Sequence, residues 1–106
     1  MSNVTKSSGN VFADLGLPES EDLLAKAELT RQIYNIIKGR KLTQKAAAKL
    51  LGIAQPDVSN LMNGRFTGFS TERLFHLLNA LDRDIEIVVR RKPAKRKEAR
   101  VSVIAA

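Results

Sequence analysis

The chain has 106 residues, of which 43% are hydrophobic and 27% charged, a composition typical of one small globular domain. No apolar run approaches the ~20 residues that cross a bilayer, and the first ten residues lack the apolar core of a signal peptide, so we expect a cytoplasmic protein. Cysteine is absent and there is one histidine, which excludes a disulfide framework and argues against a zinc site. We therefore expect no cofactor.

The net charge is +7, and the positive charge is concentrated in two blocks. Residues 38–65 carry six positive charges against one negative charge, and residues 90–106 carry seven against one. Residues 1–37 and 66–89 each have a net charge of −2. Localised positive charge indicates a surface that binds a polyanion such as nucleic acid, although a basic face can also serve solubility alone.

The first helix is expected to follow a mobile N-terminal segment, residues 1–18, and to run from about Glu19 to Lys38. Its first turn is rich in carboxylates, which the positive end of the helix dipole favours. Gly39 is expected to end it. The apolar residues that recur at helical spacing are Leu29, Ile33, Ile36 and Ile37.

Two short helices are expected next. Thr43 can cap a helix from Gln44 to Leu51, and Gly52 can end that helix. A third helix is expected from about Gln55 to Met62, with Pro56 in the first turn, where its missing N–H would have no intrahelical partner anyway.

A fourth helix, capped by Ser70, carries a stripe of leucines, and residues 84–90 then change to the alternating, β-branched pattern of a strand. A lone strand leaves its backbone groups unpaired. It can pair with the same strand of a second copy in a homodimer or dock on the helices of its own chain. The residues expected to form the dimer contact are Ile85, Ile87, Val88 and Val89.

The spacing of small and apolar residues predicts a helix-turn-helix. Ala48 is expected where the second and third helices approach most closely, and Gly52 where the chain turns between them. The side chains expected to face the interior are Ala47, Ala48, Leu51, Ile53, Val58 and Leu61. The overall prediction is an all-α helix-turn-helix domain over residues 19–90, with one C-terminal strand and a flexible basic tail over residues 91–106.

The outer face of the third helix carries amides and a hydroxyl. Gln55, Ser59 and Asn63 lie four residues apart, and Asn60 adjoins them. An amide presents a donor and an acceptor together, which is the pair that reads adenine in the major groove. Asp57, on the same helix, suits the positive end of the helix dipole, or it can accept from a cytosine amino group.

The motifs LTQ, AA, LGI, QPDVSNL, GRF and FS between residues 42 and 70 resemble the Cro/repressor-type helix-turn-helix family, often called XRE. Together with the opening NVFADLGLP and the closing RDIEIVV, they resemble HigA-type antitoxins over roughly residues 10–90. That resemblance implies a homodimeric repressor that binds an inverted-repeat operator in double-stranded DNA, represses its own operon and neutralises a small basic toxin of RelE-like fold. Under it, Gln55, Ser59 and Asn60 face bases. The residues expected at phosphates are Gln44, Lys45, Lys49, Asn63 and Arg65.

No set of residues indicates an enzyme, because the single histidine, His76, lies between leucines of the fourth helix and no cysteine accompanies it. Two alternatives to the antitoxin are a stand-alone regulator without a toxin partner and a protein-interaction module. The basic tail can lie along DNA or remain a solvated extension.

Overall fold

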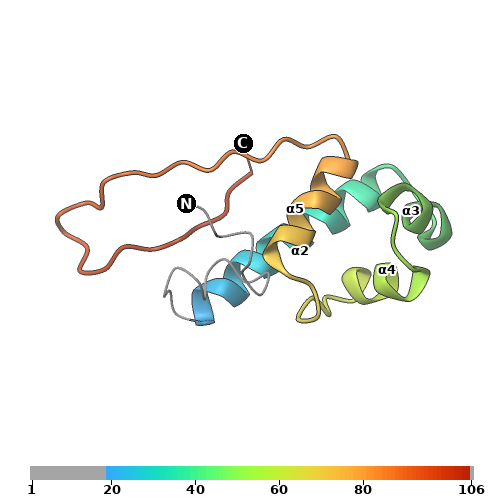
Figure 1. The fold of residues 1–106 in the computed structure, drawn as a ribbon, viewed down its shortest axis with the longest axis horizontal. Helices are drawn as coiled ribbons and strands as arrows, with labels where there is room; N and C mark the ends of the chain where they lie inside the picture. The colour runs from blue at the N-terminus through green and yellow to red at the C-terminus, as the bar shows by residue number, and fades with distance from the viewer. Residues whose placement is uncertain (1–18, 106) are drawn as a thin grey trace.

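Four helices build the domain in the computed structural model, which describes residues 19–105. The expected mobile segment at residues 1–18 lies outside these residues. The long first helix packs along the last one, and the two short helices lie together at one end of the molecule (Figure 1). The all-helical prediction is confirmed. The helices are α2 (Glu19–Gly39), α3 (Gln44–Leu51), α4 (Gln55–Met62) and α5 (Thr71–Ala80).

The predicted apolar stripe of α2 forms the centre of the core. Leu29, Ile33 and Ile37 are buried there with the leucines of α5. The same helix also buries polar groups that the apolar pattern did not predict. The ammonium of Lys26 lies 3.7 Å from the carboxylate of Asp22, and the hydroxyl of Thr71 donates to Asp22 at 3.5 Å. This contact ties the start of α5 to the first turns of α2.

Local signals in the sequence set most helix ends. The Thr43 side chain accepts a hydrogen bond from the Ala46 N–H at 3.0 Å, and Ser70 accepts one from the Arg73 N–H at 3.0 Å. The predicted end of α2 is slightly displaced: the helix includes Gly39, and the residue in the left-handed region is Lys41, with φ 57°.

The turn between α3 and α4 is built on Gly52, as predicted. Its φ of 71° and ψ of 31° are left-handed, and its N–H donates to the Ala48 carbonyl at 2.9 Å. The alanine that is fully buried, however, is Ala47, with 0% of its surface exposed, whereas Ala48 is partly buried. Both alanines were predicted to face the interior, and Ala47 is the more deeply buried of the two.

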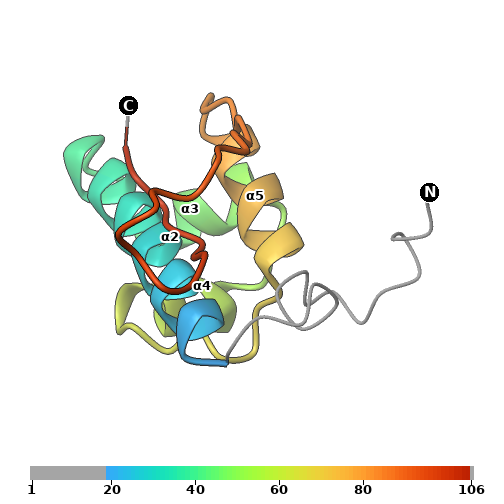
Figure 2. The ribbon, with the colours of Figure 1, turned by 90° about the vertical axis from the view of Figure 1, so that its left-hand side faces the viewer.

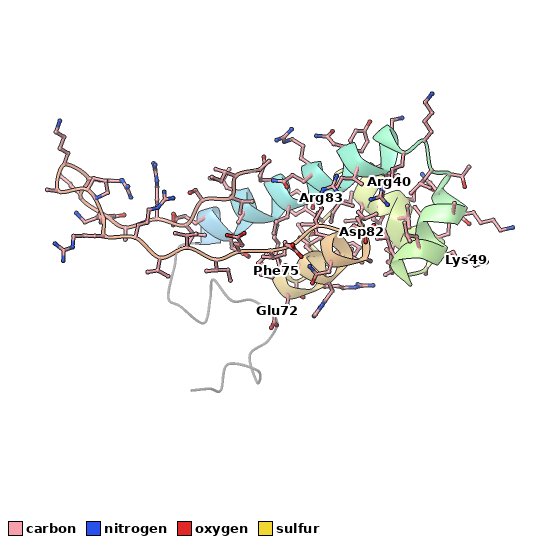
Figure 3. The ribbon with its side chains drawn as sticks, turned by 90° about the horizontal axis from the view of Figure 1, so that it is seen from above. Arg40, Lys49, Glu72, Phe75, Asp82 and Arg83 are labelled. Atoms are coloured by element: carbon pink, nitrogen blue, oxygen red, sulfur yellow. The ribbon has the colours of Figure 1, made fainter. Side chains whose placement is uncertain are left out.

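The end of α5 is held by a cation from the end of α2. The Arg40 guanidinium donates to the Leu81 carbonyl at 2.9 Å and lies 3.8 Å from the Asp82 carboxylate. Arg83 donates to the same carbonyl at 3.3 Å. Figure 3 shows Arg40, Asp82 and Arg83 close together at this junction. One cation of the first basic block thus has a structural role.

Residues 84–90 form no strand in the described part of the chain, so the predicted strand is not found. Ile85 packs against the core, but Ile87, Val88 and Val89 are 78%, 64% and 92% exposed. The physical reason is that a strand needs a second edge, and the elements around this segment are helices.

Residues 91–105 contain no helix or strand and lead back to the helices. The Val101 N–H donates to both carboxylate oxygens of Glu21, at 3.2 and 3.3 Å, and Val103 packs against the core. Figure 2 shows this segment passing in front of α2.

Candidate nucleic-acid interface

The outer face of α4 is held toward solvent by its buried inner face. Val58 and Leu61 are almost fully buried, at 0% and 1% exposure. Gln55 is exposed in the first turn, and Ser59 and Asn60 are half-buried. The side chains of Gln55 and Asn60 make no hydrogen bond to another residue of the described range 19–105. Their amides therefore remain available to a ligand.

The predicted phosphate contact Asn63 has a partner within its own helix. Its amide nitrogen donates to the Ser59 carbonyl at 2.8 Å and lies 3.4 Å from the Ser59 hydroxyl. The chain then turns at Gly64, whose φ is 75°, and the Arg65 N–H donates to the Asn60 carbonyl at 2.8 Å. Asn63 thus closes the last turn of α4, while Arg65 is exposed beside it.

The carboxylate on α4 is neutralised from within the chain. Asp57 lies 3.2 Å from the guanidinium of Arg73, and that guanidinium is 4.6 Å from the centre of the Phe69 ring. Both partners are half-exposed, so the pair orients α4 on α5 more than it stabilises the domain. Sequence reasoning placed Asp57 at the start of α4 but did not identify Arg73. The two residues are 16 positions apart, and their contact depends on the packing of two helices.

Cations and an amide surround this face. The side chains of Gln44, Lys45 and Lys49 on α3 are exposed, as is Arg65 after α4, and none forms an ion pair with another described residue. Lys49 lies at the end of the molecule in Figure 3. These groups lie on α3, which packs on α4, and directly after α4.

The surface formed by α3 and α4 suits a polyanion that also presents hydrogen-bonding edges. Asp57 is the only carboxylate in residues 38–65, and it is paired. A helix fits into the major groove of DNA, where amides read base edges and flanking cations meet phosphates. Two short helices joined at a left-handed glycine, with polar groups on the outside of the second, define a helix-turn-helix DNA-binding domain.

Comparison with known proteins agrees with this class. A family model described as a helix-turn-helix domain matches residues 11–90. A solved structure named as an XRE family transcriptional regulator is 50% identical, with a TM-score of 0.81, and the match covers 84% of this chain and 100% of that chain. No curated protein matches the chain. The chain belongs to the helix-turn-helix domain family, as a DNA-binding transcriptional regulator of the XRE type.

This family consists of DNA-binding regulators and not of enzymes, in agreement with the sequence prediction. Among the described residues, no helix is both long enough and apolar enough to span a membrane.

Proposed function

We propose that this protein is a sequence-specific repressor that inserts α4 into the major groove of its operator. In this proposal Gln55, Ser59 and Asn60 read base edges. The support is the outer face of α4, where Gln55 is exposed and Asn60 is half-buried, and neither amide has a hydrogen-bond partner in the described chain. Pro56 occupies the first turn beside Gln55 and has no polar side-chain group, so we expect it to contribute nothing to base reading.

The phosphate contacts in this proposal come from both sides of α4. Gln44 and Lys45 lie in the first turn of α3, where backbone N–H groups and the helix dipole favour an anion. Lys49 and Arg65 add positive charge, and these contacts set the register on DNA without reading sequence. Asn63 is the weakest member of the set, because its amide nitrogen must leave Ser59 to reach a phosphate.

The repressor is proposed to act as a homodimer on an inverted repeat. The support is the extended segment 84–90, whose exposed β-branched side chains suit antiparallel pairing with a second copy. Two α4 helices would then meet half-sites about one helical turn, ~34 Å, apart or a multiple of it. Sedimentation of Val88→Asp, with Val88→Thr as the control, tests this. A dimeric Val88→Asp variant would contradict pairing through this segment.

A finer proposal is that the protein is the antitoxin of a type II toxin–antitoxin pair. Its support is the resemblance of NVFADLGLP at residues 10–18 and RDIEIVV at residues 83–89 to HigA-type antitoxins. The partner would be a small basic toxin of RelE-like fold, and the DNA target would be the operator of their shared operon. The test is co-expression with the neighbouring gene. If the product of the neighbouring gene does not co-purify with this protein and does not arrest growth when expressed alone, the protein is a stand-alone regulator.

Affinity measurements with point variants test the repressor proposal. Gln55→Ala should cost about 1–3 kcal/mol on the DNA upstream of the gene and relax selectivity at one base pair. Asn35→Ala, an exposed amide on α2, is the matched control and should bind as wild type. Lys49→Ala should weaken binding to all sequences and lower the salt dependence, whereas Lys49→Arg should retain it. If Gln55→Ala and Lys49→Ala both bind as wild type, the docking is wrong.

A further inference from the structure

The second block of positive charge forms a loop that is anchored at both ends. We name residues 90–100 the basic loop; it carries seven cations and one carboxylate. On its N-terminal side Ile85 packs against the core, and on its C-terminal side the Val101 N–H binds the Glu21 carboxylate while Val103 packs against the core. The loop is therefore closed on the helices of the domain.

Lys92 and Arg96 shape the tip of the basic loop, the first through its side chain and the second through its backbone. The Arg96 N–H donates to the Pro93 carbonyl at 3.1 Å, which closes a turn. The Lys92 ammonium donates to the Pro93 carbonyl at 3.2 Å and also to the Arg96 carbonyl. Lys92 and Arg96 are half-buried as a result. The Lys92 ammonium and the Arg96 backbone therefore order the turn that presents the other cations.

The other five cations of the loop are exposed: Arg90, Arg91, Lys95, Lys97 and Arg100. None of them has an ion-pair partner within residues 19–105, because all four salt bridges of that range lie elsewhere. Like charges at this density repel one another and gather counterions. Binding a polyanion releases such counterions, which favours association at low salt.

The basic loop lies at the opposite end of the molecule from α3 and α4 (Figures 1 and 2). It therefore cannot be part of the face of α4 that reads bases. An anchored loop also loses less conformational freedom on binding than a free tail does. The basic loop is therefore a second interaction surface, because it is separate from α4, carries unpaired charge and is anchored at both ends.

We propose that the basic loop binds the phosphate backbone of DNA outside the base pairs contacted by α4, without regard to sequence. This inference rests on the proposed function, because α4 is what brings DNA to the molecule. Duplex DNA is favoured over other anionic partners because the chain is a DNA-binding regulator with a separate DNA-facing surface. The loop would add affinity and salt dependence, and α4 would add selectivity.

The test is the salt dependence of binding by Lys95→Gln/Lys97→Gln/Arg100→Gln in the full chain. Each lost phosphate contact should lower the slope of log K against log salt by about 0.9. For three contacts, the advantage of wild type over the variant should fall by about 40-fold between 50 and 200 mM salt for each bound chain, and by the square of that factor for a homodimer. The loss should be equal on operator and scrambled duplexes. Lys92 and Arg96, which hold the turn, are unchanged, so thermal unfolding should match wild type.

The matched control is Lys95→Arg/Lys97→Arg/Arg100→Lys, which keeps the charge and should keep the wild-type slope. An unchanged slope in the glutamine variant overturns the proposal, even if the loop binds anionic vesicles, and it leaves sequence-specific repression standing. The converse result is also distinguishable. If wild type binds operator and scrambled DNA equally but with a loop-dependent slope, the basic loop is confirmed and the repressor function is contradicted.

Discussion

Replacing Gly52 with alanine isolates the backbone requirement of the turn between α3 and α4. Gly52 has φ 71°, and a Cβ built there meets no atom within 4 Å. The substitution therefore introduces no clash, and its cost is that of holding an L-residue in the left-handed region, roughly 1–2 kcal/mol. Alanine also lowers the conformational entropy of the unfolded chain, which stabilises the folded state by about 0.4–1 kcal/mol. The expected net loss is about 1 kcal/mol.

Gly68 provides the matched control, because a Cβ there also meets nothing within 4 Å and its φ is not left-handed. Gly68→Ala should raise stability by about 0.4–1 kcal/mol. This gain is common to both variants, so they should differ by the left-handed cost alone, roughly 1–2 kcal/mol. The assay is urea unfolding followed by helical circular dichroism, with equal m-values required. If Gly52→Ala is as stable as Gly68→Ala, the left-handed turn does not carry the cost assigned to it.

Three further substitutions test single contacts. Thr30→Val removes a hydroxyl that is buried without a hydrogen-bond partner in the described chain. The free energy of unfolding in urea should rise by about 1 kcal/mol. A fall of the same size would show that the hydroxyl has a partner. Lys41→Gly removes the side chain from a residue held at a left-handed φ and should raise stability by about 0.5–1 kcal/mol. A lower urea midpoint would show that the left-handed φ of Lys41 does not destabilise the fold. Asp57→Asn should lower stability by about 0.5 kcal/mol through the loss of its Arg73 pair, and should strengthen binding to every DNA sequence. Loss of selectivity at one base pair would instead make Asp57 a reader of cytosine.

Local chemistry made most of the fold predictable. The stripe of leucines and isoleucines, the caps Thr43 and Ser70 and the turn at Gly52 act over a few residues, and each has the predicted role. The face of α4 followed from the same pattern, because burying Val58 and Leu61 leaves the amides outside.

Contacts between distant positions were beyond the sequence pattern. Arg40 reaches a carbonyl 41 residues away, and Asp57 reaches Arg73 across two helices. Neither contact can be predicted from the spacing of residues in the sequence, because each depends on how whole helices pack. The strand over residues 84–90 depends on a partner edge, which the periodicity of one chain cannot supply.

The most direct test of the central claim is chemical footprinting of guanine N7, which lies in the major groove, on the DNA upstream of the gene. Insertion of two α4 helices predicts two protected clusters about 10 base pairs, or a multiple of that, apart. Protection should resist scrambled competitor DNA, and Gln55→Ala should need a higher protein concentration to give the same protection, because one adenine contact in each half-site is lost. Absence of any protection in the major groove, or identical competition by operator and scrambled duplexes, would contradict sequence reading by α4.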